Sequence, residues 1–396
     1  MNELKGFLRK DGRKGIRNSL QVVYLVECAH HVAREIVRDI NQNNVQVLGF
    51  PGCYPNSYAL DLVSSLCTHP NVGAILLISL GCEGFDRHKL KERISQSGRP
   101  VSSLVIQENG GTAETIKTGV KWIKQEIKQL EKMKPVDMAI SELSVGTICG
   151  GSDGTSGITG NPAVGLAFDH LIDDGATCIF EETGELIGCE HHMASRAVND
   201  DVSKKIYAAI EKAANYYTVL GHGSFAPGNA DGGLTTQEEK SMGAYCKSGE
   251  KQISGVILPG EEPKTGGLYL MDVVPDGDVR FGFPNIADTA EIIELIASGC
   301  HTILFATGRG SVVGSVISPV IKICSNPKTY EKMSADMDIN AGAILTGEAS
   351  LRSVGKDIYN LTLQVARGAE SKSEEMRHQE QLITYKYFER GTYCGK

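Results

Sequence analysis

The chain has 396 residues, a formal net charge of -8 and 45 glycines. This length is too great for one ordinary core and predicts two domains. The acidic balance, without a basic patch or stripe, argues against a nucleic-acid partner, and the absence of any run near eighteen apolar residues argues against a membrane span. The 11 cysteines include no CxxC pair, so we expect neither a secreted disulfide framework nor a zinc finger, but a cytoplasmic protein.

The first 140 or so residues alternate strand and helix signals four times. Apolar, β-branched runs predict strands, and runs with helical periodicity predict helices. This alternation predicts a parallel, doubly wound, Rossmann-like sheet. The predicted strands are 20–27, 45–50, 72–81 and 101–107, and the predicted helices are 29–40, 57–67, 87–97 and 112–132.

The stretch KPVD at 134–137 is typical of a hinge. We therefore expect a Rossmann-like α/β domain over 1–136 and a second, catalytic α/β domain over 137–396. The second domain has the same mixture of signals as the first. Its predicted helices are 163–175, 201–217, 290–299 and a charged tail at about 370–388, and its predicted strands are 177–182, 267–274 and 301–307.

Three predicted strands of the first domain end in polar loops, PGCYPN, GCEG and ENGGT. The carboxyl ends of parallel strands lie along one edge of a sheet, where ligands usually bind. We therefore expect Cys53, Cys82 and Asn109 to share that edge.

The stretch CGGSDGTSGITGNPAVG begins at Cys149. Pro162 and the apolar run after it predict a helix, so the glycine-rich residues before it form the loop that enters the helix. Glycine loops and helix N-termini present N–H groups to anions, and Ser152 and Asp153 add polar groups. No GKS or GKT follows, so this is not a phosphate-binding Walker loop. Two interpretations stay open: a small-anion or metal site, or a capped helix entry with a buried cysteine.

The stretch FEETGELIGCEHHM gathers four glutamates, a cysteine and two histidines within fourteen residues. Carboxylates that follow a strand can bind a hard metal ion or transfer protons. Glu185 and His192 are the candidates for acid–base roles here. The alternative is a solvated acidic turn.

The stretch GNADGGLTTQEEKSMG predicts a helix start with a threonine cap and glutamates in the first turn. Lys240 is a candidate base or anion partner on this helix.

In FATGRGSVVGS, glycines flank Arg309 after a predicted strand. The guanidinium group can bind a carboxylate or sulfonate through two hydrogen bonds. We assign substrate binding to Arg309 with Gly308, Gly310 and Ser311. The later SADMDINAG places Asp336 and Asp338 in one turn, where they could hold the arginine or a metal ion, or only cap the turn.

Taken together, these motifs resemble those of the altronate and galactarate dehydratases, over nearly the whole chain. The shared stretches are KDGRKGIRN, GCEG, CGGSDGTSGITGNPAVG, ETGE, PGNADGGLTTQEEKSMG, TGRGSVVG and DMDINAG. The resemblance implies a cytosolic, iron-dependent lyase that acts on small 2-hydroxycarboxylates. It also implies that Cys149, Cys53 and Cys82 bind the metal, as Fe²⁺ or an iron–sulfur cluster, with Glu182 and Glu185 as rival ligands.

Two departures from the dehydratase pattern are FPGCYPN and the segment before TGRGS. They look more like a sister branch of the family, the large subunits of the (2R)-sulfolactate sulfo-lyases. That branch implies a separate small subunit, a homo- or hetero-oligomer, and elimination of sulfite to give a 2-oxo acid, whereas a dehydratase eliminates water. Lys240, His192 and Glu185 are the candidates for the base. A metabolite-binding subunit without activity and a nicotinamide oxidoreductase are the competing classes; no GxGxxG follows the first strand, which argues against the latter.

Overall fold

The computed structural model describes residues 4–221, 223–224, 226–275, 286–381, 383–384 and 386. It divides into two compact units. Unit 1 holds the residues up to Met138 with Val316–Ser318 and Gln381–Lys386, and unit 2 holds Ala139–Ser315 and Pro319–Glu380. Parallel sheets surrounded by helices form both units, which confirms the predicted α/β class. Within the described ranges, no helix has the length and apolar character needed to cross a membrane.

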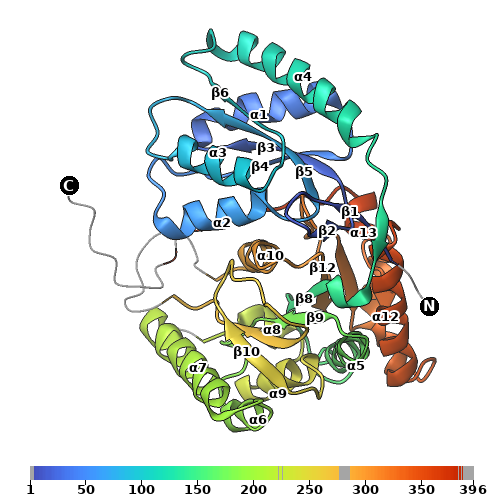
Figure 1. Ribbon diagram of the computed structural model, residues 1–396. Helices are drawn as coiled ribbons and strands as arrows, with labels where there is room; N and C mark the ends of the chain where they lie inside the picture. The colour runs from blue at the N-terminus through green and yellow to red at the C-terminus, as the bar shows by residue number, and fades with distance from the viewer. Residues whose placement is uncertain are drawn as a thin grey trace. The chain divides into compact units, whose positions relative to one another are not determined.

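Unit 1 is built on a four-stranded parallel sheet in the order β4-β3-β5-β6. Helices α1 and α4 cover one face, and α2 and α3 cover the other (Figure 1). All eight residues of β5 are buried, which explains why this strand is a nearly continuous apolar run. The elements are β3 (Ser19–Tyr24), α1 (Glu27–Ile40), β4 (Val45–Gly49), α2 (Ser57–Cys67), β5 (Val72–Ser79), α3 (Arg87–Gln96), β6 (Val101–Val105) and α4 (Gly111–Leu130).

The predicted hinge at 134–137 is adjacent to the boundary between the two units, which lies between Met138 and Ala139, and its last two residues begin a strand. Strand β7 (Val136–Met138) pairs antiparallel with β1 (Leu4–Leu8), and β1 also pairs with β2 (Lys14–Gly15). Directly before the KDGRKGIRN segment, the buried Arg9 donates hydrogen bonds to the Pro70 carbonyl and to the side chain of Asn18, the last residue of that segment, both at 2.7 Å. This basic segment therefore serves the structure of unit 1.

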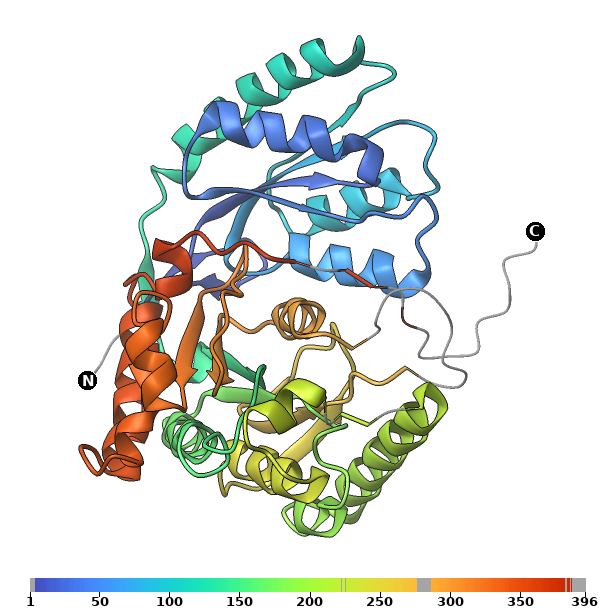
Figure 2. The ribbon, with the colours of Figure 1, turned by 180° about the vertical axis from the view of Figure 1, so that it is seen from behind.

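Unit 2 is built on a seven-stranded parallel sheet in the order β10-β11-β9-β8-β12-β13-β14. The chain leaves the central β8 toward β9 on one side and later returns to β12 on the other. Helix α10 covers one face, and α5 with α12 covers the other (Figure 2). The point where the strand order reverses therefore lies between β8 and β12, and ligands of doubly wound sheets bind at such a point.

The strands of unit 2 are β8 (Ser144–Cys149), β9 (Thr177–Phe180), β10 (Ile253–Ile257), β11 (Gly267–Met271), β12 (Thr302–Thr307), β13 (Val320–Cys324) and β14 (Ile339–Asn340). The helices are α5 (Gly160–Asp173), α6 (Glu190–Ala194), α7 (Asp200–Leu220), α8 (Pro227–Asp231), α9 (Gln237–Lys247), α10 (Asp288–Ala297), α11 (Pro327–Lys332), α12 (Leu351–Ala366) and α13 (Lys372–Glu375). Short 3-10 turns occupy Ile140–Glu142 and Ala341–Ile344.

The prediction of a long helical tail is wrong for its described part. Only α13 is helical, and the later described residues up to Lys386 are not. Hydrogen bonds from unit 1 replace those of a helix: the Gln381 side chain donates to the Val47 carbonyl at 3.0 Å, and the Lys386 carbonyl accepts from the Asn56 side chain at 2.8 Å. Residues 387 and 388 of the predicted helix lie outside the described residues.

Candidate active site

Two glycine-rich loops meet at the carboxyl ends of β8 and β12. The Gly150 N–H donates to the Ala306 carbonyl at 3.1 Å, and the Arg309 N–H donates to the Gly151 carbonyl at 2.9 Å. Gly151 has a φ of +63°, in the left-handed region that favours glycine. The glycines thus let the first loop turn sharply and lie against the second, at the strand reversal.

Asp153 holds the first loop together. It is 2% exposed, and its carboxylate accepts hydrogen bonds from the Thr155 N–H (2.9 Å), the Thr155 hydroxyl (2.6 Å) and the Asn326 side chain (2.8 Å). The second loop packs on it so closely that a Cβ on Gly308 would lie 2.2 Å from Oδ1. Protein donors occupy this carboxylate, which indicates a role in building the loop.

Cys149 ends β8 and begins the loop. Its Sγ lies 3.1 Å from the Ser152 hydroxyl, and its backbone N–H donates to Glu182 Oε1 at 2.5 Å. The Ser152 carbonyl accepts from the Asn229 side chain at 2.9 Å. These bonds fix a half-buried thiol and a hydroxyl group side by side.

Helix α9 presents two lysines to two glutamates of the loop that follows β9. Lys240 Nζ donates to Glu185 Oε1 at 3.1 Å, and Lys247 pairs with Glu182. Lysines seven residues apart lie on one face of a helix, two turns from each other. The inner pair is buried, with side chains 1% and 4% exposed, whereas those of the outer pair are 9% and 19% exposed. The inner pair therefore fixes the helix, and the outer pair is the one that a ligand can reach.

The glutamate loop departs from ordinary backbone geometry at its first turn. Glu182 has a φ of +90°, which is rare for a residue other than glycine. The preceding Glu181 is 1% exposed, and neither of its carboxylate oxygens has a hydrogen-bond donor within the described residues. Burial and the charge of Glu185 raise the pKa of Glu181 well above its ordinary value. A buried carboxyl group whose neutral form is favoured thus lies beside the ion pairs.

The pKa values of Lys240 and Asp288 are also shifted by burial and by the charges around them. Burial alone would lower the pKa of Lys240, but Glu185 and Cys149 outweigh it and raise the pKa. Asp288 is exposed as a residue, yet its carboxylate lies so close to Gly150 that a Cβ there would be 2.0 Å from Oδ2. Desolvation and the charge of Glu185 raise the pKa of Asp288 to about 6. Because its own pKa is raised, Lys240 carries its charge at neutral pH.

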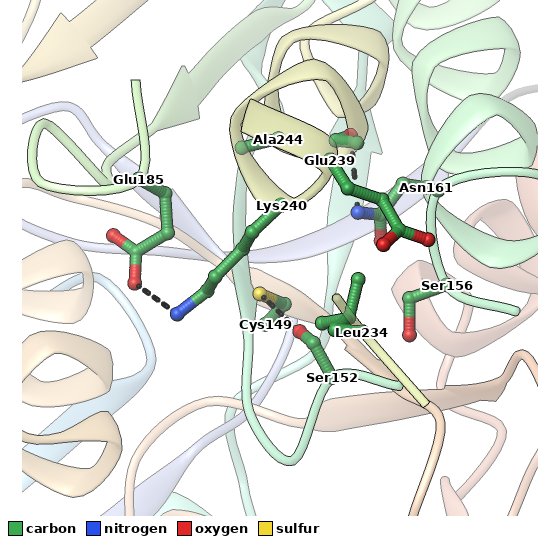
Figure 3. Close-up of a pocket in the computed structure, with 11 residues that line it drawn as sticks. Cys149, Ser152, Ser156, Asn161, Glu185, Leu234, Glu239, Lys240 and Ala244 are labelled. Carbon is green, nitrogen blue, oxygen red and sulfur yellow. Dashed lines mark hydrogen bonds and ion pairs between the residues drawn. The ribbon is translucent and has the colours of Figure 1, made fainter. Parts of the chain in front are cut away.

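The Lys240–Glu185 pair, Cys149 and Ser152 line a small pocket between the first loop and α9 (Figure 3). Its volume is about 10 Å³, close to the space for one water molecule. Lys240 points toward Glu185 on one side, with Cys149 and Ser152 beside them, and Asn161 lies toward the other side. The lining residues are Cys149, Ser152, Ser156, Gly157, Asn161, Glu185, Leu234, Glu239, Lys240, Gly243 and Ala244.

The structure brings together four of the residues singled out from the sequence: Lys240, Glu185, Cys149 and Ser152. His192 lies elsewhere, exposed on α6 and facing the Tyr245 ring at 6.0 Å.

Four further predicted residues build the loop next to the pocket without lining it. The Arg309 side chain is exposed and donates to the Gly228 carbonyl. Gly310 has a φ of +88°, and its N–H donates to the Thr307 hydroxyl at 3.0 Å. Gly308 packs on Asp153, and the Ser311 hydroxyl accepts from the Val313 N–H at 3.2 Å.

Sequence reasoning missed Lys247, Asp288 and Asn161. Lys247 carried one usable signal, its spacing of seven residues from Lys240 on a predicted helix. Asp288 begins α10, and only the fold brings it to Gly150. Asn161 resembled an ordinary residue of a helix first turn.

The predicted thiol ligands belong to different units. Cys53 and Cys82 are exposed residues of unit 1, and Cys149 belongs to unit 2. Within the described ranges, no group of three or more His, Cys, Asp or Glu side chains is arranged to hold a metal ion. The described residues of unit 2 therefore do not by themselves supply a complete ligand set for iron.

The fold and site define an enzyme-like α/β protein, with its charged pocket at the reversal of a parallel sheet. Two family models match the chain. One, the C-terminal part of D-galactarate/altronate dehydratase, covers 140–389, and the other, the second domain of D-galactarate dehydratase/altronate hydrolase, covers 6–131. The chain belongs to the galactarate and altronate dehydratase family, as its motifs predicted, and is an enzyme of the lyase class.

Three relatives show the range of named activities. The (2R)-sulfolactate sulfo-lyase subunit beta of Chromohalobacter salexigens is 32% identical, over 96% of this chain and 97% of that protein. The altronate dehydratase of Bacillus subtilis is 32% identical, over 92% of this chain and 74% of that enzyme. The galactarate dehydratase (L-threo-forming) of Escherichia coli is 31% identical, over 92% of this chain and 72% of that enzyme. Sequence identity alone therefore does not separate the substrates.

Proposed function

We propose that this protein performs β-elimination on a small 2-hydroxycarboxylate to give a 2-oxo acid, and that its substrate is (2R)-sulfolactate, which becomes pyruvate and sulfite. The observation that carries the reaction class is the Lys240–Glu185 pair, which lines the pocket beside Cys149 and Ser152. Carboxylates are common general bases, and positioned cations stabilise negative charge that develops during a reaction. The family relationship supports the same class.

The two members of the pair have different proposed roles. A lysine acts as a base only when neutral, and the raised pKa of Lys240 favours its charged form. We therefore assign the base to Glu185, whose carboxylate takes the proton from C2. The Lys240 ammonium group then stabilises the enediolate charge on the substrate carboxylate.

The elimination breaks the C2–H and C3–S bonds and forms a double bond between C2 and C3. The electrons of the C2–H bond form the C2–C3 double bond, and the electrons of the C3–S bond leave with sulfite. The enol that remains takes a proton at C3, loses the proton of its 2-hydroxyl group and becomes pyruvate. No oxidant or reductant takes part.

The extent of the matches supports the smaller substrate. The relative named for sulfolactate is matched over 97% of its length, whereas those named for altronate and galactarate are matched over 74% and 72%. Relatives named for sugar acids make a sugar-acid hydro-lyase the second candidate. An anaerobic assay with iron and a panel of (2R)-sulfolactate, altronate and galactarate separates them. Sulfite and pyruvate formed together support the proposal, whereas a 2-keto-3-deoxy sugar acid establishes the second candidate.

The proposed cofactor is iron, with the Cys149 thiolate as its ligand in unit 2. Thiolates suit iron, and bound iron would act as a Lewis acid on the substrate carboxylate and hydroxyl. We expect Cys149→Ala to lose bound iron by elemental analysis, with the exposed Cys28→Ala as control. Cys53→Ala and Cys82→Ala test the other predicted ligands in the same way. Full iron occupancy in Cys149→Ala would exclude this role.

The proposed partner is a separate small subunit, because one relative is named as a subunit beta. Adding the product of a neighbouring small-subunit gene to the assay should raise turnover, and joint elution in gel filtration would show the complex and its oligomeric state. We place the protein in the cytoplasm, because all ten cysteines within the described ranges are free thiols, as expected in a reducing compartment.

A further inference from the structure

Asn161 has an unusual combination of burial and an unpartnered oxygen. It lies in the first turn of α5, is 3% exposed, and lines the pocket. Its Nδ2 donates to the Gly243 carbonyl at 3.0 Å, but Oδ1 has no donor within the described residues. A backbone carbonyl only accepts, so this bond fixes which end of the amide is nitrogen. The amide oxygen therefore points away from Gly243 (Figure 3).

The surroundings keep the amide in this orientation. Gly243 packs directly on the first loop, so closely that a Cβ there would lie 3.1 Å from the Gly157 Cα. Helix α9 is thereby held against the start of α5, and the Gly243 carbonyl cannot easily turn away from Asn161. A buried acceptor without a donor is destabilising, and a ligand that supplies a donor removes that penalty.

We propose that Asn161 Oδ1 accepts a hydrogen bond from the 2-hydroxyl group of the substrate and that Asn161 determines specificity for 2-hydroxy acids. This inference rests on the proposed function and extends it. Lys240 and Glu185 lie across the pocket from Asn161 and handle the carboxylate and the C2 proton. The hydroxyl is the remaining group on C2 that can donate to an oxygen.

The same bond distinguishes substrate from product. The C2 hydroxyl of the substrate donates, whereas the C2 carbonyl of the 2-oxo product only accepts. Two acceptors that face each other in a buried site are unfavourable. Conversion of the enol to the ketone therefore removes the bond to Asn161 and favours product release.

The test compares two ligands that differ only in the hydroxyl group, (2R)-sulfolactate and 3-sulfopropanoate. Binding is measured by ligand-induced melting shifts and by inhibition. The wild-type protein should prefer sulfolactate by about 10-fold to 100-fold. Asn161→Leu, similar in size but without an acceptor, should lose this preference through weaker sulfolactate binding alone. Asn161→Asp keeps an acceptor oxygen but not the donor to Gly243, and should keep the preference.

Several outcomes would overturn the assignment. A preference that survives in Asn161→Leu would exclude the oxygen as its source. Equal weakening of both ligands in Asn161→Leu and Asn161→Asp would mean that Asn161 only anchors α9. If the wild-type protein neither binds nor converts sulfolactate, the proposed substrate is wrong, and the same three proteins are tested with lactate and propionate. A preference for lactate that Asn161→Leu abolishes would still support the acceptor, and equal or absent binding of both would refute it.

Discussion

The carboxyl edges of the two parallel sheets differ in how they affect the pKa of a nearby carboxyl group. In unit 1, burial would raise the pKa of Glu83, but hydrogen bonds from the Ser79 hydroxyl and the Gly81 N–H outweigh it and lower the pKa. In unit 2, Glu181 has no such donors within the described residues, and its pKa is raised. At the first edge hydrogen bonds satisfy the carboxylate, whereas at the second a buried carboxyl group lies without them near the charge of Glu185. Such perturbed groups mark functional sites, so architecture alone does not make an active site.

Among the variants that test this difference between the two edges, Lys240→Met in unit 2 should have the largest effect on activity. It removes the cation that faces the developing charge, so we expect kcat to fall by about 1,000-fold, within the range for loss of a charge-stabilising group. Steady-state kinetics on (2R)-sulfolactate provides the measurement. The control is Lys124→Met, an exposed position of α4 in unit 1. If both variants lose activity equally, or neither does, the contrast between the two edges has no catalytic meaning.

A second variant compares a buried ion pair of unit 2 with an exposed one of unit 1. Lys247→Met leaves the buried Glu182 without its counter-charge, so we expect a loss of about 3 kcal/mol in unfolding free energy. The double variant Glu182→Gln with Lys247→Met should recover part of it. Lys5→Met breaks the pair between Lys5 and Asp137, whose side chains are 53% and 72% exposed, and should leave the unfolding free energy nearly unchanged. Urea denaturation of these three variants and of the wild-type protein decides whether burial sets the difference in unfolding free energy.

Much of the fold could be predicted because local patterns agree with it. Strand β5 is apolar up to its last residue since both its faces are covered, and α2 has the predicted bounds of 57–67. The predicted threonine cap of α9 is confirmed, because the Thr236 hydroxyl accepts from the Glu239 N–H. Strand β8 was missed although it is central, because SVGTIC mixes apolar residues with small and polar ones. The pairing of β7 with the distant β1 leaves no mark in the local sequence.

Site residues could be predicted where they lie in glycine-rich loops or clusters of charged residues. They could not be predicted where the site depends on contacts between distant segments. Cys149, Ser152, Glu185 and Lys240 lie in such stretches and share the pocket. The orientation of the Asn161 amide depends on a carbonyl 82 residues away, and no sequence pattern encodes that pairing.

Arg309→Lys tests the second loop of unit 2 at a smaller expected effect. Lysine keeps the charge but loses the planar pair of donors that binds a carboxylate or sulfonate. We expect KM to rise about 10-fold while kcat changes little, because the exposed side chain lies beside the pocket and not in it. Unchanged KM and kcat would remove the predicted anion-binding role and leave Arg309 as a loop residue, held by the Gly228 carbonyl.

The smallest effect compares two aspartates whose pKa values shift in opposite directions. In unit 2, burial raises the pKa of Asp338 to about 6, even though its carboxylate accepts from the N–H groups of Lys322 (2.7 Å) and Lys372 (2.8 Å). In unit 1, burial would raise the pKa of Asp11, but hydrogen bonds from Arg13 and Arg99 outweigh it and lower the pKa.

The signs of the two stability changes follow. Between about pH 4 and pH 6 the folded state holds a proton on Asp338 that the unfolded state has lost, so this group makes stability fall as pH rises. The contribution of Asp11 is present above about pH 4 and is lost as pH falls through its lowered pKa.

Asp338→Asn should therefore be less destabilising at pH 7 than at pH 4, by roughly 1–2 kcal/mol after allowance for solvent screening. Asp11→Asn should be more destabilising at pH 7 than at pH 3. The lost acceptor oxygen shifts each curve by a constant, so the slope of unfolding free energy against pH is the readout. Slopes of the same sign would show that the pKa values of the two carboxyl groups do not shift in opposite directions.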